Sequence, residues 1–187
     1  MELPGLSEEP TVASERIYRG RVVALRVDRV ALGDGAPALR EIVEHADVAV
    51  VVAVDGKGRV ALVRQYRKAV ERALLEVPAG GIEEGEDPEQ GAKRELEEET
   101  GLRASVWRRI GGFYSAPGYC TEFLHLFLAS QLQQGVSRPD HDERIAVEWA
   151  SLGDAIRLVM DGRICDAKSV AGLLMAQAHL AVHKASG

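Results

Sequence analysis

The stretch from Gly80 to Leu102, GGIEEGEDPEQGAKRELEEETGL, carries nine Asp or Glu residues and only two cationic residues. Glu95, Glu98 and Glu99 are spaced i,i+3 and i,i+4, so they would share one face of a helix. Like charges one helical turn apart repel by roughly 0.2–0.5 kcal/mol per pair, so this clustering calls for a compensating positive charge. Carboxylate and carbonyl oxygens suit a hard divalent cation such as Mg²⁺ or Mn²⁺. A solvated acidic helix is the alternative, and spacing alone does not decide between them.

The helix that would carry these glutamates has clear ends. The segment DPEQ at 87–90 predicts an N-cap, a first-turn proline and a capping box, and Gly101 predicts a left-handed C-cap. The helix follows LLEVPAGG, whose Gly-Gly bend would bring a strand end and free carbonyls beside its first turn. Arg94 and Glu97 are expected to point away from the glutamate face. That face would then hold few cations, which favours an external cation over the solvated helix.

The remaining pattern predicts a mixed sheet flanked by helices. A loose tail of about ten residues precedes the first strand, and a GDG turn at 33–35 separates N-terminal strands. Asp166 is expected to cap the last helix, with Leu173, Leu174 and Leu180 on its apolar stripe. Strands are predicted over 16–32, 38–45, 48–54, 59–67, 122–132 and 145–150, and helices over 88–100, 152–160 and 167–184.

Composition excludes some classes of partner. The 187 residues are 46% hydrophobic and 28% charged, as in an ordinary globular protein. A formal net charge of −6 argues against nucleic-acid binding, which usually requires a basic face. The opening MELPGLSEEP lacks the basic and apolar regions of a signal peptide, and no apolar run has the length of a membrane span, so we expect no membrane partner. Cys120 and Cys165 are isolated thiols, which favours a reducing cytoplasm.

The acidic stretch resembles the signature of the Nudix hydrolase family, G-x5-E-x7-R-E-U-x-E-E-x-G-U, in which U is a bulky aliphatic residue. The specified positions are all matched, by Gly80, Glu86, Arg94, Glu95, Leu96, Glu98, Glu99, Gly101 and Leu102. The resemblance implies an α+β protein with the α/β/α sandwich of the Nudix fold, acting as a pyrophosphohydrolase with Mg²⁺ or Mn²⁺. Such ions neutralise a diphosphate and lower the pKa of an attacking water, which explains the clustered carboxylates.

The resemblance also implies roles within the stretch. Glu95 and Glu99 correspond to the main metal ligands, and Glu98 corresponds to a catalytic residue that shares a second or third ion. The Ala79 carbonyl would complete the ligand set. Arg94 corresponds to a residue that orients the glutamates without touching the substrate.

Segments outside the signature resemble the ADP-ribose pyrophosphatase subgroup. They are SAPGYCTE at 115–122, VRQYR at 63–67 and GRICDAKSVAGLL at 162–174. The subgroup resemblance implies hydrolysis of ADP-ribose to AMP and ribose 5-phosphate, with Pro117 and Gly118 at the substrate site. An ordinary Pro-Gly turn is the alternative reading of these two residues.

Further residues are carried over by the same resemblance. Arg67 corresponds to an arginine that contacts the phosphates, and Arg64 is a weaker candidate for that role. Glu122 corresponds to a glutamate near the reaction centre, with a surface acid as the alternative. Glu143 best fits a further acid, either the general base or a metal ligand, on a loop before the last core strand. His141 stands where some relatives have a glutamate, so the base stays open between Glu143, Glu122 and His141.

The N-terminal strands resemble a subdomain that is exchanged between two chains in this subgroup. We therefore expect a homodimer, with residues 1–45 as the N-terminal tail and β subdomain and 46–187 as the catalytic domain. Arg21 and Val22 would reach the partner's site, and Glu41 and Glu83 would hydrogen-bond the adenosine end of the substrate.

Three other functions stay open from the sequence. The chain could hydrolyse another nucleoside diphosphate sugar such as GDP-mannose or ADP-glucose, because residues outside the signature select the substrate. It could instead bind ADP-ribose without cleaving it. The intact signature and the lack of room for an added DNA-binding domain count against that sensor. Hydrolysis of damaged nucleoside triphosphates is disfavoured by Pro117 and by the N-terminal strands.

Overall fold

The computed structural model describes residues 8–137 and 144–184. The chain divides into two compact units, one of Met1–Ala46 with Tyr114–Glu122 and the other of Asp47–Phe113 with Phe123–Gly187. The segment Tyr114–Glu122 joins the first unit because the Val43 N–H donates to the Tyr119 carbonyl at 2.7 Å and the Val43 carbonyl accepts from the Thr121 N–H at 3.0 Å.

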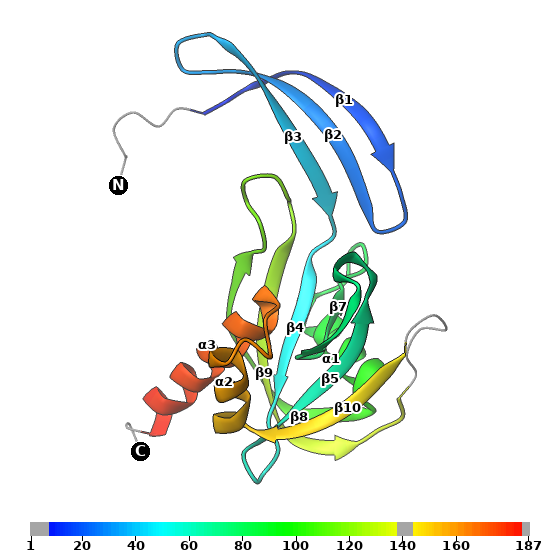
Figure 1. Cartoon of the computed structure of the whole chain (residues 1–187), viewed down its shortest axis with the longest axis vertical. Helices are drawn as coiled ribbons and strands as arrows, with labels where there is room; N and C mark the ends of the chain where they lie inside the picture. The colour runs from blue at the N-terminus through cyan, green and yellow to red at the C-terminus, as the bar shows by residue number, and fades with distance from the viewer. Residues whose placement is uncertain (1–7, 138–143, 185–187) are drawn as a thin grey trace. The chain divides into compact units, whose positions relative to one another are not determined.

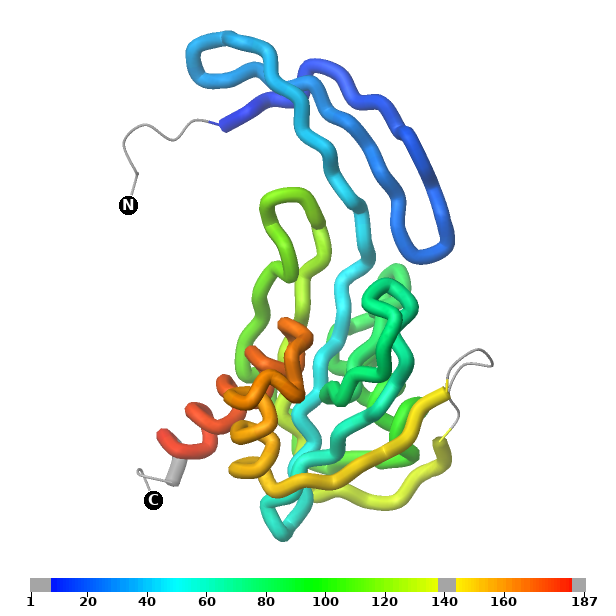
Figure 2. Tube along the Cα trace, in the orientation of Figure 1, coloured from blue at the N-terminus to red at the C-terminus, as the bar shows by residue number. Residues whose placement is uncertain are grey.

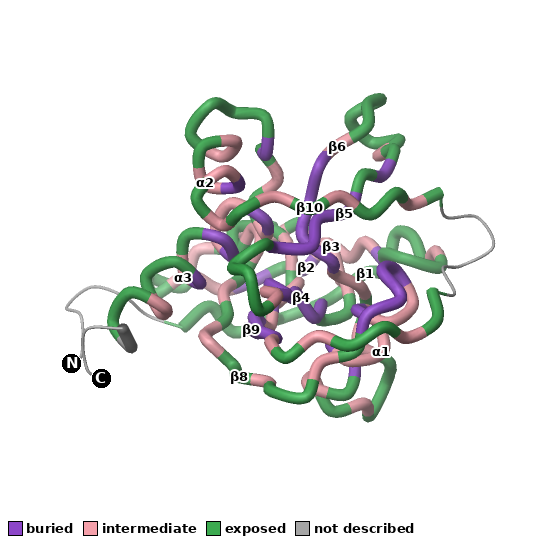
Figure 3. Tube along the Cα trace, turned by 90° about the horizontal axis from the view of Figure 1, so that it is seen from below, coloured by how far each residue is buried: buried purple, intermediate pink, exposed green. Residues whose placement is uncertain are grey.

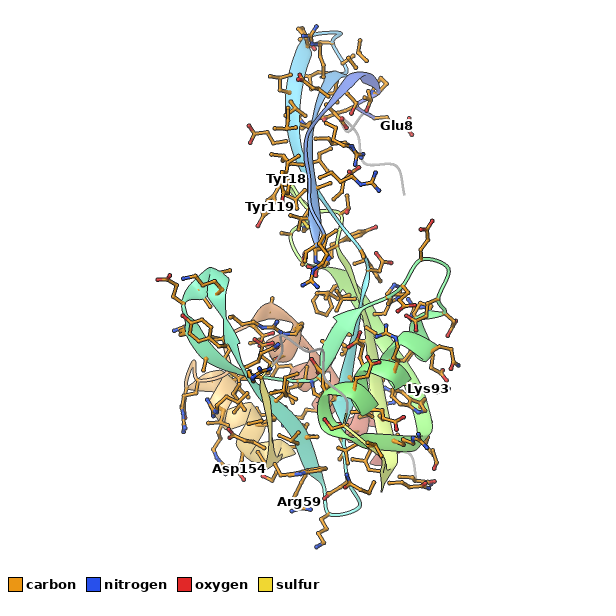
Figure 4. All side chains as sticks on the ribbon, turned by 90° about the vertical axis from the view of Figure 1, so that its right-hand side faces the viewer. Glu8, Tyr18, Arg59, Lys93, Tyr119 and Asp154 are labelled. Carbon is orange, nitrogen blue, oxygen red and sulfur yellow. The ribbon has the colours of Figure 1, made fainter. Side chains whose placement is uncertain are left out.

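The first unit is a three-stranded antiparallel sheet in the order β1-β2-β3. Its strands are β1 (Thr11–Arg19), β2 (Val23–Ala31) and β3 (Pro37–His45). Side chains stand out from both faces of this sheet (Figure 4). Among its described residues only Ala24, Asp28 and Val30 are buried.

The second unit contains two further sheets (Figure 1). One has the order β7-β4-β9-β8, with β4 parallel to β9, and the other has the order β10-β5-β6 and is antiparallel. These strands are β4 (Val48–Ala53), β5 (Arg59–Arg67), β6 (Arg72–Glu76), β7 (Ala79–Gly81), β8 (Leu102–Tyr114), β9 (Phe123–Gln134) and β10 (Ile145–Ser151).

In the described residues of this unit, three α-helices and one 3-10 turn accompany the strands along the trace in Figure 2. They are η1 (Lys68–Val70), α1 (Pro88–Thr100), α2 (Leu152–Met160) and α3 (Ala167–Lys184). Ser151 caps α2, as its Oγ accepts the Asp154 N–H at 3.0 Å, and Asp166 caps α3, as its Oδ2 accepts the Ser169 N–H at 3.1 Å. Within the described part of the chain, no helix combines the length and the apolar character needed to cross a bilayer.

Successive side chains of β4 point to opposite faces of the sheet, and a different set of helices packs against each face. Val48, Val50 and Val52 pack in the core cluster that includes residues of α2 and α3, whereas Ala49 and Val51 pack with residues of α1. Every residue of β4 is buried, as the continuous β-branched run predicts, and Figure 3 shows this strand in purple inside the unit. The mixed sheet flanked by helices is therefore confirmed, with α1 on one side and α2 and α3 on the other.

Some element predictions need correction. The first strand begins at Thr11, five residues before the predicted start, and β6, β7 and β8 were not predicted. Leu173 is fully buried in α3, but Leu174 is 40% exposed, so Leu174 does not belong to the buried stripe. The small residues Ser169, Gly172 and Ala176 take up buried positions on that helix beside Leu173.

Candidate metal centre

Helix α1 is fixed in rotation by its apolar side. Ala92 and Leu96 are fully buried in the core cluster on the α1 face of the sheet. The predicted cap is present, because the Asp87 carboxylate accepts the N–H groups of Glu89 and Gln90, and Gly101 closes the helix at φ 67°. The Lys93 side chain labelled in Figure 4 marks the outer side of α1. The cap and the buried side together hold the signature glutamates in one orientation.

Arg94 links the acidic residues of the signature. Its Nη1 donates to Glu95 Oε1 at 2.6 Å and to Glu98 Oε2 at 3.1 Å, and its Nε and Nη2 donate to the two oxygens of Glu86 at 3.1 and 2.9 Å. Nη2 also donates to the Gly81 carbonyl at 2.8 Å. The expectation that Arg94 points away from the glutamate face is thus wrong, because Glu98 lies one helical turn on and the long side chain folds back over it.

This cluster changes the titration of its members. The hydrogen bond from Arg94 holds the pKa of Glu86 below its usual value, and the hydrogen bond to Glu86 raises the pKa of Arg94. The Arg94 guanidinium thus stays charged and supplies part of the positive charge that the cluster requires. Because Arg94 donates to both Glu95 and Glu98, it is placed to orient these two carboxylates.

Glu99 faces the backbone of the preceding strand. Its carboxylate is almost fully buried, and its Oε2 accepts the Ala79 N–H at 3.0 Å. Ala79 is held by the pairing of β7 with β4, in which it lies opposite Val50. Since that pairing fixes the peptide, the Ala79 backbone and the Glu99 carboxylate are brought together from segments twenty residues apart.

Gly80 lets Glu95 approach the backbone closely. A Cβ atom at Gly80 would lie 2.1 Å from the carboxyl carbon of Glu95, well inside van der Waals contact. Any residue with a Cβ at this position would therefore require the Glu95 carboxylate to shift. A pocket of about 280 Å³ opens here, lined by Ala79, Gly80, Gly81, Glu83, Arg94, Glu95 and Glu98.

The donors around this pocket fit a hard divalent cation. They are carboxylates and main-chain carbonyls, the oxygen ligands that Mg²⁺ and Mn²⁺ prefer. Among the described residues no three His, Cys, Asp or Glu side chains already converge as a cation cage. Arg94 draws Glu95 and Glu98, and the Ala79 N–H holds Glu99. Glu143, the other expected ligand, and His141 lie outside the described residues.

Arg67 lies against a buried acid. Its Nε and Nη2 donate to Glu76 Oε1 and Oε2 at 3.0 and 2.7 Å. This hydrogen bond raises the pKa of Arg67, and the charges of Glu99 and Asp166 contribute in the same direction. Arg64, in contrast, pairs with Glu148 of β10 at 2.5 Å. The two arginines are three residues apart on β5, so they fall on opposite faces.

Two other glutamates of the acidic stretch have separate positions. Glu83 is exposed at the pocket, and its N–H donates to Glu86 Oε2 at 3.0 Å. Glu97 points away from the signature face, as expected, and accepts from Arg103 Nε at 2.8 Å. Arg103 and Glu97 line a second hollow, of about 210 Å³, together with Arg94, Glu98 and Val136.

Six expected site residues belong to the first unit. Val22, Glu41, Pro117 and Gly118 are exposed, Arg21 is exposed in the turn between β1 and β2, and Glu122 lies 3.5 Å from His45 Nδ1. The pocket around Glu95 belongs to the second unit, so the substrate and catalytic roles of these six residues stay predictions.

Sequence reasoning missed the partners of Arg67. Glu76 is 1% exposed, and Lys168 Nζ donates to its Oε2 at 2.5 Å. Burial raises the pKa of Glu76, but the Arg67 hydrogen bond and the Lys168 charge outweigh it and leave the pKa below its usual value. The available signal was a single acid inside the apolar segment LLEVP, because a buried carboxylate requires a paired cation.

The chain is similar in sequence to a known domain family and to characterised proteins. The NUDIX domain family matches residues 43–172. The ADP-ribose pyrophosphatase of Bacillus subtilis (strain 168) is 43% identical, over 87% of this chain and 89% of the relative. The methanol dehydrogenase activator of Bacillus methanolicus is 39% identical over 88% and 90%. A GDP-mannose pyrophosphatase of Yersinia enterocolitica is 30% identical over 79% and 82%.

The fold is shared with a solved structure as well. The crystal structure of an ADP compounds hydrolase superposes with a TM-score of 0.87 at 21% identity, over 97% of this chain and 98% of that chain. Four residues of the signature, Gly80, Arg94, Glu95 and Glu98, line the polar pocket. Together with the family match, the similar relatives and the shared fold, this shows that the chain belongs to the Nudix family.

Proposed function

We propose that this protein hydrolyses the diphosphate linkage of ADP-ribose to AMP and ribose 5-phosphate, with Mg²⁺ or Mn²⁺ as the cofactor. The observation that carries the proposal is the convergence of Glu95, Glu98 and Arg94 with the Ala79–Gly81 strand on one polar pocket. The relative named ADP-ribose pyrophosphatase, at 43% identity, supports the choice of substrate.

The acidic residues of α1, the Ala79 carbonyl and Arg94 have separate tasks in this proposal. Glu95, Glu99 and the Ala79 carbonyl hold the cation, and Glu98 shares a further ion. When bound, divalent cations neutralise the diphosphate and lower the pKa of the attacking water. Arg94 keeps Glu95 and Glu98 oriented through its hydrogen bonds at 2.6 and 3.1 Å.

Arg67 and the residues of the loops would select and orient the substrate. The Arg67 guanidinium suits a phosphate oxygen, because it presents several donors in a plane. Arg64 stays the weaker candidate, since it lies three residues from Arg67 and so on the opposite face of β5, where it pairs with Glu148. For the general base we propose Glu143 ahead of Glu122 and His141. The pH–rate profiles of Glu143→Gln, Glu122→Gln and His141→Ala would identify the base by the loss of the acidic limb, where the rate falls because the base becomes protonated.

The test is a product assay on the purified protein with Mg²⁺. ADP-ribose, GDP-mannose, ADP-glucose, NADH and a nucleoside triphosphate are offered separately, and the products are separated by chromatography. AMP and ribose 5-phosphate, formed from ADP-ribose much faster than products from the other substrates, are expected. Faster hydrolysis of GDP-mannose would replace the substrate by the alternative that the 30% identical relative supports. Binding of ADP-ribose without hydrolysis would contradict enzymatic function and support a sensor.

We also propose that the protein is a homodimer in which the N-terminal sheet is exchanged, so that Arg21, Val22, Glu41 and the partner's Nudix unit form one adenosine site. All nine residues of β1 are exposed, and Val12, Ile17 and Tyr18 on this strand are each more than half exposed. A sheet with so little burial of its own requires a covering surface. Light scattering is expected to give twice the chain mass of 20.2 kDa, and a monomer would contradict the exchange.

We place the reaction in the cytoplasm. Cys120 and Cys165 are both free thiols, which is typical of proteins that work in a reducing compartment. A fluorescent fusion that appeared outside the cytoplasm would contradict this assignment.

A further inference from the structure

A buried ion cluster lies under the strand that precedes the metal pocket. Glu76 ends β6 and is 1% exposed. Its two carboxylate oxygens accept hydrogen bonds from Nε and Nη2 of Arg67. Lys168 of α3 donates to Glu76 Oε2 at 2.5 Å and to Asp166 Oδ2 at 2.8 Å. Both the Lys168 and the Asp166 side chains are 15% exposed. Two cations and two anions therefore form a neutral cluster in which Glu76, Lys168 and Asp166 are largely removed from water, whereas the Arg67 side chain is 37% exposed.

The position of Lys168 is unfavourable by local rules. It stands in the first turn of α3, where the helix dipole favours anions and disfavours a cation. A residue that breaks a local preference needs a compensating interaction elsewhere in the structure. The carboxylates of Glu76 and of the capping residue Asp166 supply that interaction, so Lys168 links the first turn of α3 to the end of β6.

The same turn of α3 also holds the chain between Glu76 and the metal pocket. The Val77 N–H donates to the fully buried Ser169 Oγ at 2.8 Å. On the other side the Val51 N–H donates to the Pro78 carbonyl at 2.9 Å. The next residue is Ala79, whose N–H donates to Glu99 at 3.0 Å. Hydrogen bonds at Val77, Pro78 and Ala79 thus hold the chain between Glu76 and the pocket.

We propose that Lys168 and Ser169 are positioning residues for the metal centre. Lys168 secures Glu76, Ser169 secures Val77, and the two contacts together set the Ala79 peptide against Glu99. This inference rests on the proposed metal-dependent function and adds residues of α3 to it. Residues hydrogen-bonded directly to metal ligands typically change metal affinity by about 10- to 100-fold when they are removed. Lys168 and Ser169 act one step further from the ligands, through Glu76 and Val77, so we expect an effect at the lower end of that range.

The test measures Mn²⁺ binding directly, by electron paramagnetic resonance of the free ion in the presence of full-length protein. Lys168→Met removes the charge at similar length, and we expect the dissociation constant to rise by about 10-fold. Lys168→Arg restores the charge and should recover most of the affinity. Lys57→Met is the matched control, since Lys57 is an exposed residue of the β4–β5 turn that uses its backbone N–H, not its side chain, to bind Asp55.

Ser169→Ala provides an independent arm without a change of charge, should Lys168→Met fail to fold. It leaves the Val77 N–H without its acceptor, so we expect weaker Mn²⁺ binding and a turnover that recovers at high Mg²⁺. A folded Lys168→Met or Ser169→Ala variant with the wild-type dissociation constant would overturn the proposal, even if its melting temperature fell. Failure of the wild-type protein to bind Mn²⁺ would instead contradict the proposed metal-dependent function.

Discussion

The substitution Gly80→Ala tests the position of a single proposed metal ligand, Glu95, with little change to the rest of the fold. The new Cβ would lie 2.1 Å from the Glu95 carboxyl carbon, whereas ordinary contact begins at 3.4 Å, so the carboxylate has to move by about 1.3 Å. A displacement of about 1 Å at a reacting group can cost about 100-fold in rate. We therefore expect kcat/KM to fall by about 100-fold, which corresponds to about 2.7 kcal/mol of transition-state stabilisation.

The assay is ADP-ribose hydrolysis over a series of Mg²⁺ concentrations, with thermal unfolding measured in parallel. Gly56→Ala is the matched control, because a Cβ at Gly56 meets no atom within 4 Å. It adds the same methyl group in the β4–β5 turn and should leave both the rate and the melting temperature unchanged. A Gly80→Ala enzyme that retains more than half of the wild-type kcat/KM at every Mg²⁺ concentration would refute the close approach of Glu95.

Three further outcomes follow from the geometry. Glu99→Gln should lose most of the turnover while circular dichroism stays unchanged, and near-normal rates at saturating Mg²⁺ would remove Glu99 from the metal site. Leu173→Ala should lower the free energy of unfolding by about 2–5 kcal/mol, whereas Leu174→Ala, at a 40% exposed position, should change it by less than about 0.5 kcal/mol; equal effects in urea unfolding would contradict the assigned burial. The folded-state pKa of Glu76 lies below its usual value of 4.5, so its contribution to stability is present above that value and lost as the pH falls through the folded-state pKa. The difference in stability between wild type and Glu76→Gln should therefore shrink below about pH 4.5, and a difference that stays constant down to pH 3 would contradict the ion pair.

The sequence predicts well the helices and strands whose ends or burial are determined by neighbouring residues. Helix α1 begins and ends where Asp87 and Gly101 indicate, and β4 is buried along its whole length, as its β-branched run indicates. Strand β8 was missed because its burial pattern is irregular over Leu102–Tyr114, with no sustained alternation of apolar positions. Strands β6 and β7 are too short for a period to be visible, and their pairing with β5 and β4 is a tertiary property.

The same distinction applies to the site. Spacing within one helix predicts that Glu95, Glu98 and Glu99 share a face, because an i,i+3 and i,i+4 pattern needs no knowledge of the fold. In the structure Arg94 joins Glu95 and Glu98, whereas Glu99 binds the Ala79 N–H. The contact between Lys168 and Glu76 joins residues 92 positions apart, so only the packing of α3 against the strands reveals it. The predicted direction of Arg94 is wrong for a different reason. Helical spacing gives only the direction in which a side chain leaves the helix, whereas the long Arg94 side chain can bend to reach the carboxylates of Glu86, Glu95 and Glu98.

The acidic stretch is tolerated because its helix glutamates have different partners. Glu97 is bound by Arg103, Glu99 by the Ala79 N–H, and Glu95 and Glu98 by Arg94, so the repulsion between neighbours is offset inside the chain. Arg94 contacts one oxygen of Glu95, Oε1, and one of Glu98, Oε2. A carboxylate has two oxygens and about four acceptor positions, so it can keep a guanidinium and bind a cation together. A cation at this site would therefore add to the Arg94 network without dismantling it, and the charge that holds the glutamates in place would also keep them oriented for the ion.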